Sequence, residues 1–100
     1  MSNATVILKK PIMAHGDEVK TLTFREPVGE DIMACGYPLQ MGGETYIPIA
    51  GVIAKYIGRL AGIPASSVKA LSAVDFNVCM GAILPFFADS ASNQPPANED

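Results

Sequence analysis

The sequence predicts an α+β domain in which an N-terminal antiparallel β-hairpin is followed by three to four α-helices in a small bundle. Two β-branched segments lie within residues 5–25, and apolar residues at helical spacing dominate after residue 48. The chain has 100 residues, of which 49% are hydrophobic and 17% charged, which suits one core. We therefore expect a single globular domain over residues 1–88 and a disordered acidic tail over 89–100, where polar residues and two prolines gather.

Residues 5–25 predict the hairpin. In its second strand Leu22 and Phe24 occupy one face, whereas the alternating threonines occupy the other. A Gly-Asp pair at positions 16–17 is typical of the turn that would join the strands. Because proline has no N–H to donate, we expect Pro11 to end regular pairing near the turn.

Helix signals fill most of the remaining chain. We expect helices over about residues 28–35, 48–62, 66–71 and 73–87, joined after the first by a Gly- and Pro-rich loop over 36–46. Pro27 suits the first position of the first helix, and Glu30 and Asp31 place negative charge near its positive end. Gly36 should stop this helix.

The helix over 48–62 has the clearest apolar stripe. The stripe follows the i, i+3, i+4, i+7 pattern and comprises Ile49, Val52, Ile53, Tyr56, Ile57 and Leu60. Gly62 and Pro64 should terminate the helix. Glycines at 51, 58 and 62 permit close approach of another backbone, so Gly51, Gly58 and Gly62 are candidate partner-binding residues.

The C-terminal helices depend on serine caps. Ser66 or Ser67 is expected to cap the short turn, and Ser72 the last helix, with Asp75 in the capping-box position. Pro85 should end or bend that helix. Phe86 and Phe87 follow directly: Phe87 continues the apolar stripe, whereas Phe86 leaves it and should be partly exposed. Both are candidate partner contacts, the alternative being that both rings cover the end of the core.

No residue pattern indicates catalysis, a cofactor or a metal ion. Cys35 and Cys79 form no C-x-x-C pair, and the one histidine, His15, completes no usual zinc spacing with them. Adjacent helical positions point in different directions, so Glu30 and Asp31 make a poor acid–base pair. We expect a protein that is not an enzyme and carries no cofactor.

Charge and hydropathy exclude further classes. Residues 1–88 carry seven basic and seven acidic side chains, so a nucleic-acid partner is not expected. The apolar stretches fall short of a membrane-spanning helix, and no secretory signal is recognisable, which favours the cytoplasm. The open edges of the hairpin and the glycine face favour a homo-oligomer.

Four segments carry a resemblance to a known family. Leu22-Thr23-Phe24-Arg25-Glu26-Pro27 followed by Gly29-Glu30-Asp31 resembles the strand-to-helix signature of the small tail assembly chaperones of contractile-tailed phages, the Mu-like and P2-like group. The other segments are similar to the family's first strand, helix-ending turn and last helix cap, at residues 7–12, 57–64 and 71–76. Together they span about residues 5–87 in the family's order, and the loop over 36–48 departs from it.

The resemblance implies a function that composition alone does not. Such chaperones bind the hydrophobic tape measure protein, keep it soluble and help tail tube subunits polymerise around it. The resemblance also implies a protein of the host cytoplasm that is absent from the mature virion. A generic interaction or oligomerisation module is the alternative, and a small nucleic-acid-binding regulator that uses the hairpin cations is a third reading.

Overall fold

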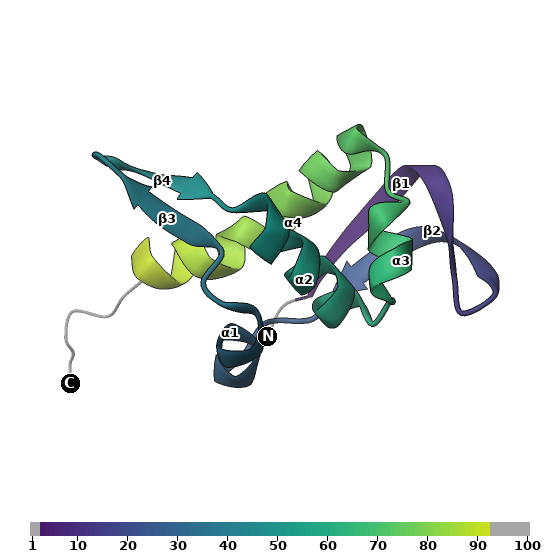
Figure 1. Ribbon diagram of the computed structural model, residues 1–100, viewed down its shortest axis with the longest axis horizontal. Helices are drawn as coiled ribbons and strands as arrows, with labels where there is room; N and C mark the ends of the chain where they lie inside the picture. The colour runs from purple at the N-terminus through teal and green to yellow at the C-terminus, as the bar shows by residue number, and fades with distance from the viewer. Residues whose placement is uncertain (1–2, 93–100) are drawn as a thin grey trace.

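The computed structural model describes residues 3–92, and it has a β-hairpin at each end with the helices between them (Figure 1). The elements are β1 (Ala4–Ala14), β2 (Asp17–Phe24), α1 (Gly29–Cys35), β3 (Leu39–Gly42), β4 (Thr45–Pro48), α2 (Ala50–Ala61), α3 (Ala65–Lys69) and α4 (Ala73–Ser92). The predicted α+β class, with an N-terminal antiparallel hairpin followed by helices, is confirmed.

β1 and β2 form the predicted hairpin, and its inner face is core. Leu22 and Phe24 are fully buried, as their alternation with threonines predicted. The turn contains His15 and Gly16, with φ of 55° and 83°, rather than the predicted Gly-Asp pair. Two consecutive positive φ values are the geometry of a type I′ turn, which matches the twist of the flanking strands.

A bulge in β1 corrects the expectation for Pro11. Pairing is interrupted between Ile7 and Ile12 and then resumes, so Pro11 interrupts the ladder without ending it. The backbone N–H groups of Lys9 and Lys10 donate to the two carboxylate oxygens of Asp75, at 2.9 and 3.0 Å. These two bonds hold the pKa of Asp75 below its ordinary value and tie the start of α4 to β1.

α1 begins two residues later than Pro27 suggested. Val28 is the N-cap, and its N–H donates to Oδ2 of Asp31 at 2.8 Å, which satisfies a donor at the helix start. Gly36 ends the helix as predicted, since its N–H donates to the carbonyl oxygen of Ile32 at 2.8 Å.

The segment predicted as a Gly- and Pro-rich loop is a second hairpin, β3–β4. Its two-residue turn holds Gly43 and Glu44, and φ of Gly43 is +68°. A positive φ at the first central residue is what a type II′ hairpin turn requires, and glycine adopts it without strain. The loop prediction over 36–46 was wrong because it counted glycines as breakers and overlooked the turn they make.

α2 and α3 pack together on one side of the core. The stripe of α2 is buried as predicted at Ile53, Tyr56, Ile57 and Leu60. α2 ends at Gly62, which is left-handed with φ of 74°, again as predicted. In α3 neither serine caps the helix, since the N-cap is Pro64. The buried Ser67 hydroxyl instead donates to the carbonyl oxygen of Met13 at 2.6 Å, which joins α3 to β1.

α4 is longer than predicted. The Ser72 hydroxyl accepts the N–H of Asp75 at 3.1 Å, which confirms this cap. The helix then continues through Pro85 to Ser92 instead of ending near residue 87. Because Pro85 has no N–H, the carbonyl of Gly81, four residues earlier, lacks its usual helical hydrogen bond. Pro85 and Gly81 are both exposed, so water can reach this carbonyl. Residues 89–92 are therefore helical, and the rest of the predicted tail lies outside the described residues.

One apolar core joins the β1–β2 hairpin to α2, α3 and α4. The Phe87 ring of α4 packs edge-on against two tyrosine rings, with its centroid 5.6 Å from that of Tyr37 and 5.2 Å from that of Tyr56. Within residues 3–92, no helix is both long and apolar enough to cross a bilayer.

Candidate functional site

A buried carboxylate between two arginines is the strongest charged cluster in the described residues. Asp31 on α1 is almost fully buried, and its carboxylate accepts hydrogen bonds from both terminal nitrogens of Arg25, at 2.7 and 2.9 Å. Nε of Arg59, on α2, donates to the same carboxylate at 2.5 Å. The Arg25 hydrogen bonds, with help from Val28 N–H and Arg59, hold the pKa of Asp31 well below its usual range.

This Asp31 cluster is structural in its geometry. The carboxylate accepts four donors and is closed to solvent, so it has no free lone pair aimed at an open site. It joins the residue that follows β2, the start of α1 and the last turn of α2. The sequence argument considered Asp31 as a helix-start charge and as a poor acid–base partner of Glu30, and it missed the six-residue spacing from Arg25 that signals this ion pair.

The remaining candidate chemical groups are either buried or hydrogen-bonded within the fold, and both cysteines, Cys35 and Cys79, are buried. Burial raises the pKa of the Cys79 thiol to about 11, so it is protonated and unreactive near neutral pH. Nε2 of His15 lies 3.0 Å from the Gly62 carbonyl oxygen and docks the hairpin turn on the end of α2. The Tyr56 hydroxyl donates to the Gly36 carbonyl oxygen at 2.6 Å, and burial raises its pKa to about 12. Within residues 3–92 no group of acidic, cysteine or histidine side chains could hold a metal ion.

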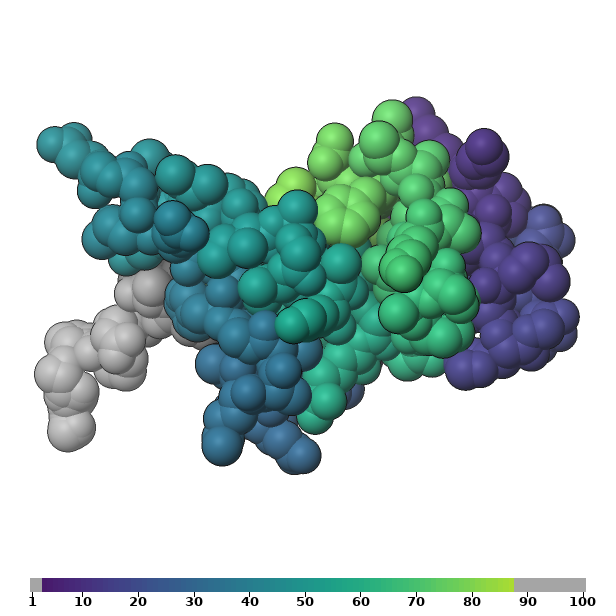
Figure 2. All heavy atoms as spheres, viewed as in Figure 1, coloured from purple at the N-terminus to yellow at the C-terminus, as the bar shows by residue number. Residues whose placement is uncertain are grey.

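The β3–β4 hairpin exposes two large apolar side chains on one of its faces, here called the hairpin patch: Met41 and Tyr46. Met41 and Tyr46 lie directly opposite each other and are 62% and 59% exposed. Figure 2 shows this hairpin projecting from one end of the body. Exposed aromatic and methionine side chains on a projecting element are typical of a protein-binding surface.

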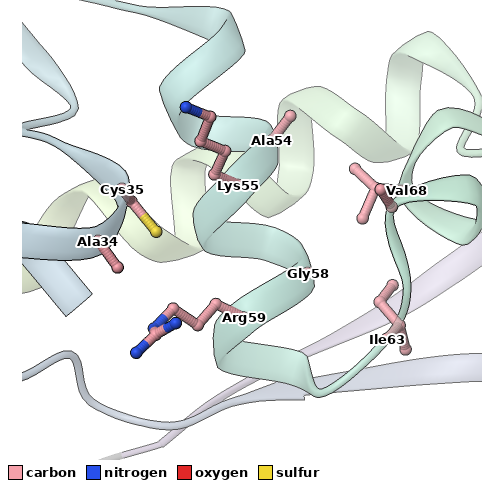
Figure 3. A pocket seen from close by; sticks show the side chains of 9 residues that line it. Ala34, Cys35, Ala54, Lys55, Gly58, Arg59, Ile63 and Val68 are labelled. Atoms are coloured by element: carbon pink, nitrogen blue, oxygen red, sulfur yellow. The ribbon is translucent and has the colours of Figure 1, made fainter. Parts of the chain in front are cut away.

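A shallow groove lies along α2 and α3, with parts of α1 and α4 also lining it, and is here called the α2–α3 groove. Three adjoining hollows form it, two of them of about 400 and 420 Å³, and all three are lined by Ala54 and Val68. Figure 3 shows one of them: Ala34 and Cys35 of α1 lie on one side of α2, and Val68 lies on the other. The apolar floor combines small side chains such as Ala54 and Ala65 with larger ones such as Val68 and Leu71, so another backbone could approach it closely beside the alanines.

The charged residues that line the α2–α3 groove are all basic: Lys55, Arg59 and Lys69. Arg59 is already held by Asp31 and lies 3.8 Å from the Glu30 carboxylate. Lys55 and Lys69 are exposed, and neither forms an ion pair with any residue in the described part of the chain. The groove therefore presents two uncompensated positive charges beside an apolar floor.

The five predicted partner-binding residues do not form one surface. Gly51 is open to solvent, Gly62 forms the end of α2, and only Gly58 lines the groove. A Cβ atom at Gly58 would lie 3.1 Å from the Ile63 carbonyl oxygen, so this glycine already serves packing within the chain. Phe87 is buried against the two tyrosines, whereas Phe86 is half-buried against the core.

Sequence reasoning did not find the two surfaces that the fold presents. The hairpin patch could have been found from two short segments, 39–42 and 45–48, separated by a two-residue turn that begins with Gly43, which is a hairpin signal. The two groove lysines come from different helices, 14 positions apart, so only the tertiary fold brings them to one groove.

Comparison with known proteins gives one match. The family model described as "phage tail assembly chaperone proteins, E, or 41 or 14" matches residues 5–88, which is most of the chain. No curated protein and no solved structure matches the chain at a significant level.

Proposed function

The chain belongs to this family of phage tail assembly chaperones, and on that premise we propose that it binds the tape measure protein, keeps it soluble and assists tail tube polymerisation. A chaperone of this kind needs accessible apolar surface and no reactive centre. We propose a non-catalytic role, since the titratable groups considered above are buried or hydrogen-bonded within the fold.

The observation that carries the proposal is the hairpin patch. Its side chains are large and apolar. They lie on β3 and β4, which contact each other more than they contact the other elements of the domain. Apolar contact of this kind is tolerant of sequence, which suits a long hydrophobic client with many similar segments. Exposure of such groups is unfavourable in the free protein, and covering them with a client removes that cost.

Co-expression with the tape measure protein of the same phage tests the proposal. We expect a higher soluble yield of the tape measure protein and its co-purification with the chain. The double variant Met41→Ser/Tyr46→Ser should lose most of this effect. The matched control Gln40→Ser/Thr45→Ser changes two residues of the opposite hairpin face and should retain it. Failure of the wild-type chain to associate with any tape measure fragment would refute the function.

Self-association is a second candidate property, and strand edges favour it. Each of the two sheets described has only two strands, so outer edges carry unpaired backbone groups. We expect light scattering to give a dimer or larger homo-oligomer, and a monomer across micromolar concentrations would reject this.

A role in tail assembly also implies contact with the tail tube protein, activity in the host cytoplasm, and absence from the mature virion. Mass spectrometry of purified particles would test this absence.

A further inference from the structure

We propose that the α2–α3 groove binds one amphipathic helix of the client whose apolar stripe is flanked by acidic side chains. This inference rests on the proposed function, because the client is the tape measure protein. It adds a surface separate from the hairpin patch and a rule for which client segments are held there.

The shape of the groove favours a helix. Ala54 on α2 and Val68 on α3 line all three hollows, and the small Ala65 of α3 lines two of them. Small side chains on a helix let a second helix approach closely, and the hollows leave room for that helix's larger apolar side chains. Helix-in-groove binding uses side chains at i, i+3, i+4 and i+7, which would lie along this floor.

The charge of the groove selects the flanks of that helix. The linings of the three hollows contain basic residues and no aspartate or glutamate. Lys55 and Lys69 are uncompensated in the described structure, and long lysine side chains reach beyond an apolar floor to meet a partner's charge. Acidic residues beside the client stripe would pair with them, whereas basic residues there would be repelled.

The hairpin patch differs in this respect. Its only charged neighbour within the strands and turn is Glu44, so it offers no complement to an acidic helix. We therefore assign tolerant apolar contact to the hairpin patch and charge selection to the groove.

A pair of designed peptides tests the assignment with the full chain. Both are labelled 18-residue amphipathic helices with the same apolar stripe, one flanked by glutamates and the other by lysines. We expect the acidic peptide to bind about tenfold more tightly at low salt, because two exposed ion pairs replace two repulsions. The preference should shrink as salt is raised, since these charges are solvent-exposed.

Charge reversal locates the site. Lys55→Glu/Lys69→Glu should invert the preference, so that the lysine-flanked peptide binds more tightly. The control Lys10→Glu/Lys20→Glu makes the same change in net charge on the β1–β2 hairpin and should leave the preference as in the wild type. Equal effects of the two double variants would overturn the proposal, since they would indicate net charge alone.

Blocking the floor gives a second readout. Ala54→Leu fills the groove and should lower the affinity for the acidic peptide about tenfold, while the melting temperature of the chain stays unchanged. The control Ala50→Leu lies outside the lining residues and should leave the affinity unchanged. If Lys55→Glu/Lys69→Glu alters self-association and leaves peptide binding unchanged, the occupant is a second copy and the proposal fails.

The groove assignment and the proposed function can fail separately. If the tape measure protein still binds equally well after both lysines are changed, only the groove assignment is refuted. Peptide binding without any tape measure association would refute the proposed function alone.

Discussion

β1–β2 lies against the helices and buries Leu22 and Phe24, whereas β3–β4 leaves Met41 and Tyr46 in contact with solvent. Both are antiparallel hairpins closed by a two-residue turn with glycine at positive φ. Local backbone preferences therefore explain why each forms, but they do not explain why one is core and the other is surface.

Length and anchoring account for the difference. β1 and β2 have 11 and 8 residues, long enough to present several inward side chains to α2 and α4, whereas β3 and β4 have four each. The first hairpin is also tied to the helices at Asp75, Ser67 and Gly62. For the second, Ile49 N–H donates to the Pro38 carbonyl oxygen at its base. A hairpin anchored only at its base can expose apolar side chains without unfolding the domain.

Truncating one aromatic ring in each hairpin tests this comparison most strongly. Phe24→Ala should lower the free energy of unfolding by about 3–5 kcal/mol, because it leaves a cavity in the core. Tyr46→Ala should change it by less than about 0.5 kcal/mol, as expected for an exposed site. Urea unfolding followed by circular dichroism measures both. Comparable losses would show that β3–β4 belongs to the core.

The Asp31 cluster tests how the two ends are joined, because it lies between the hairpins. Asp31→Asn should lower the free energy of unfolding by about 2 kcal/mol at pH 7. This loss is smaller than that expected from breaking a fully buried ion pair, since both arginines keep contact with water. The stabilisation is present above the ordinary carboxyl pKa of 3.8 and is lost as pH falls toward the lower pKa of the folded state.

Unfolding measured between pH 7 and pH 2 checks the sign of this effect. The wild type should lose stability below about pH 4, and the difference between wild type and Asp31→Asn should narrow there. Glu30→Gln is the control, because its carboxylate is exposed and lies 3.8 Å from Arg59. A gap that stays constant with pH would show that the Asp31 carboxylate is not the group that titrates.

The elements found from the sequence are those whose signals are local. Apolar spacing predicted α2 and its buried face, Gly62 predicted its end, and Ser72 predicted the start of α4. Alternation predicted that Leu22 and Phe24 would be buried. Each of these inferences uses residues within a few positions of each other.

The features that were missed depend on the rest of the fold. Asp75 was placed correctly at a helix start, but its carboxylate binds the β1 bulge 65 residues away. Pro85 continues a helix because its side of α4 faces solvent, which periodicity does not reveal. Among the residues of the candidate site, Gly58 was predicted from the sequence as a partner-binding residue, whereas the groove lysines and the hairpin patch became evident only from tertiary positions.

Matched glycine substitutions make the finest test of the comparison. Gly62 and Gly43 both have positive φ, at 74° and 68°, so alanine is strained by about 1 kcal/mol at either position. Gly62→Ala should lower the global free energy of unfolding by about that amount, because Gly62 ends α2 beside the anchored turn of the first hairpin. Gly43→Ala should instead leave global unfolding nearly unchanged and speed amide exchange within β3–β4, since that hairpin can open by itself. Gly29→Ala, at a position with no positive φ and open space around it, is the control for losing a glycine. Equal global losses at 43 and 62 would mean that the exposed hairpin unfolds together with the core, and its apolar side chains would then have to be explained as part of one cooperative unit.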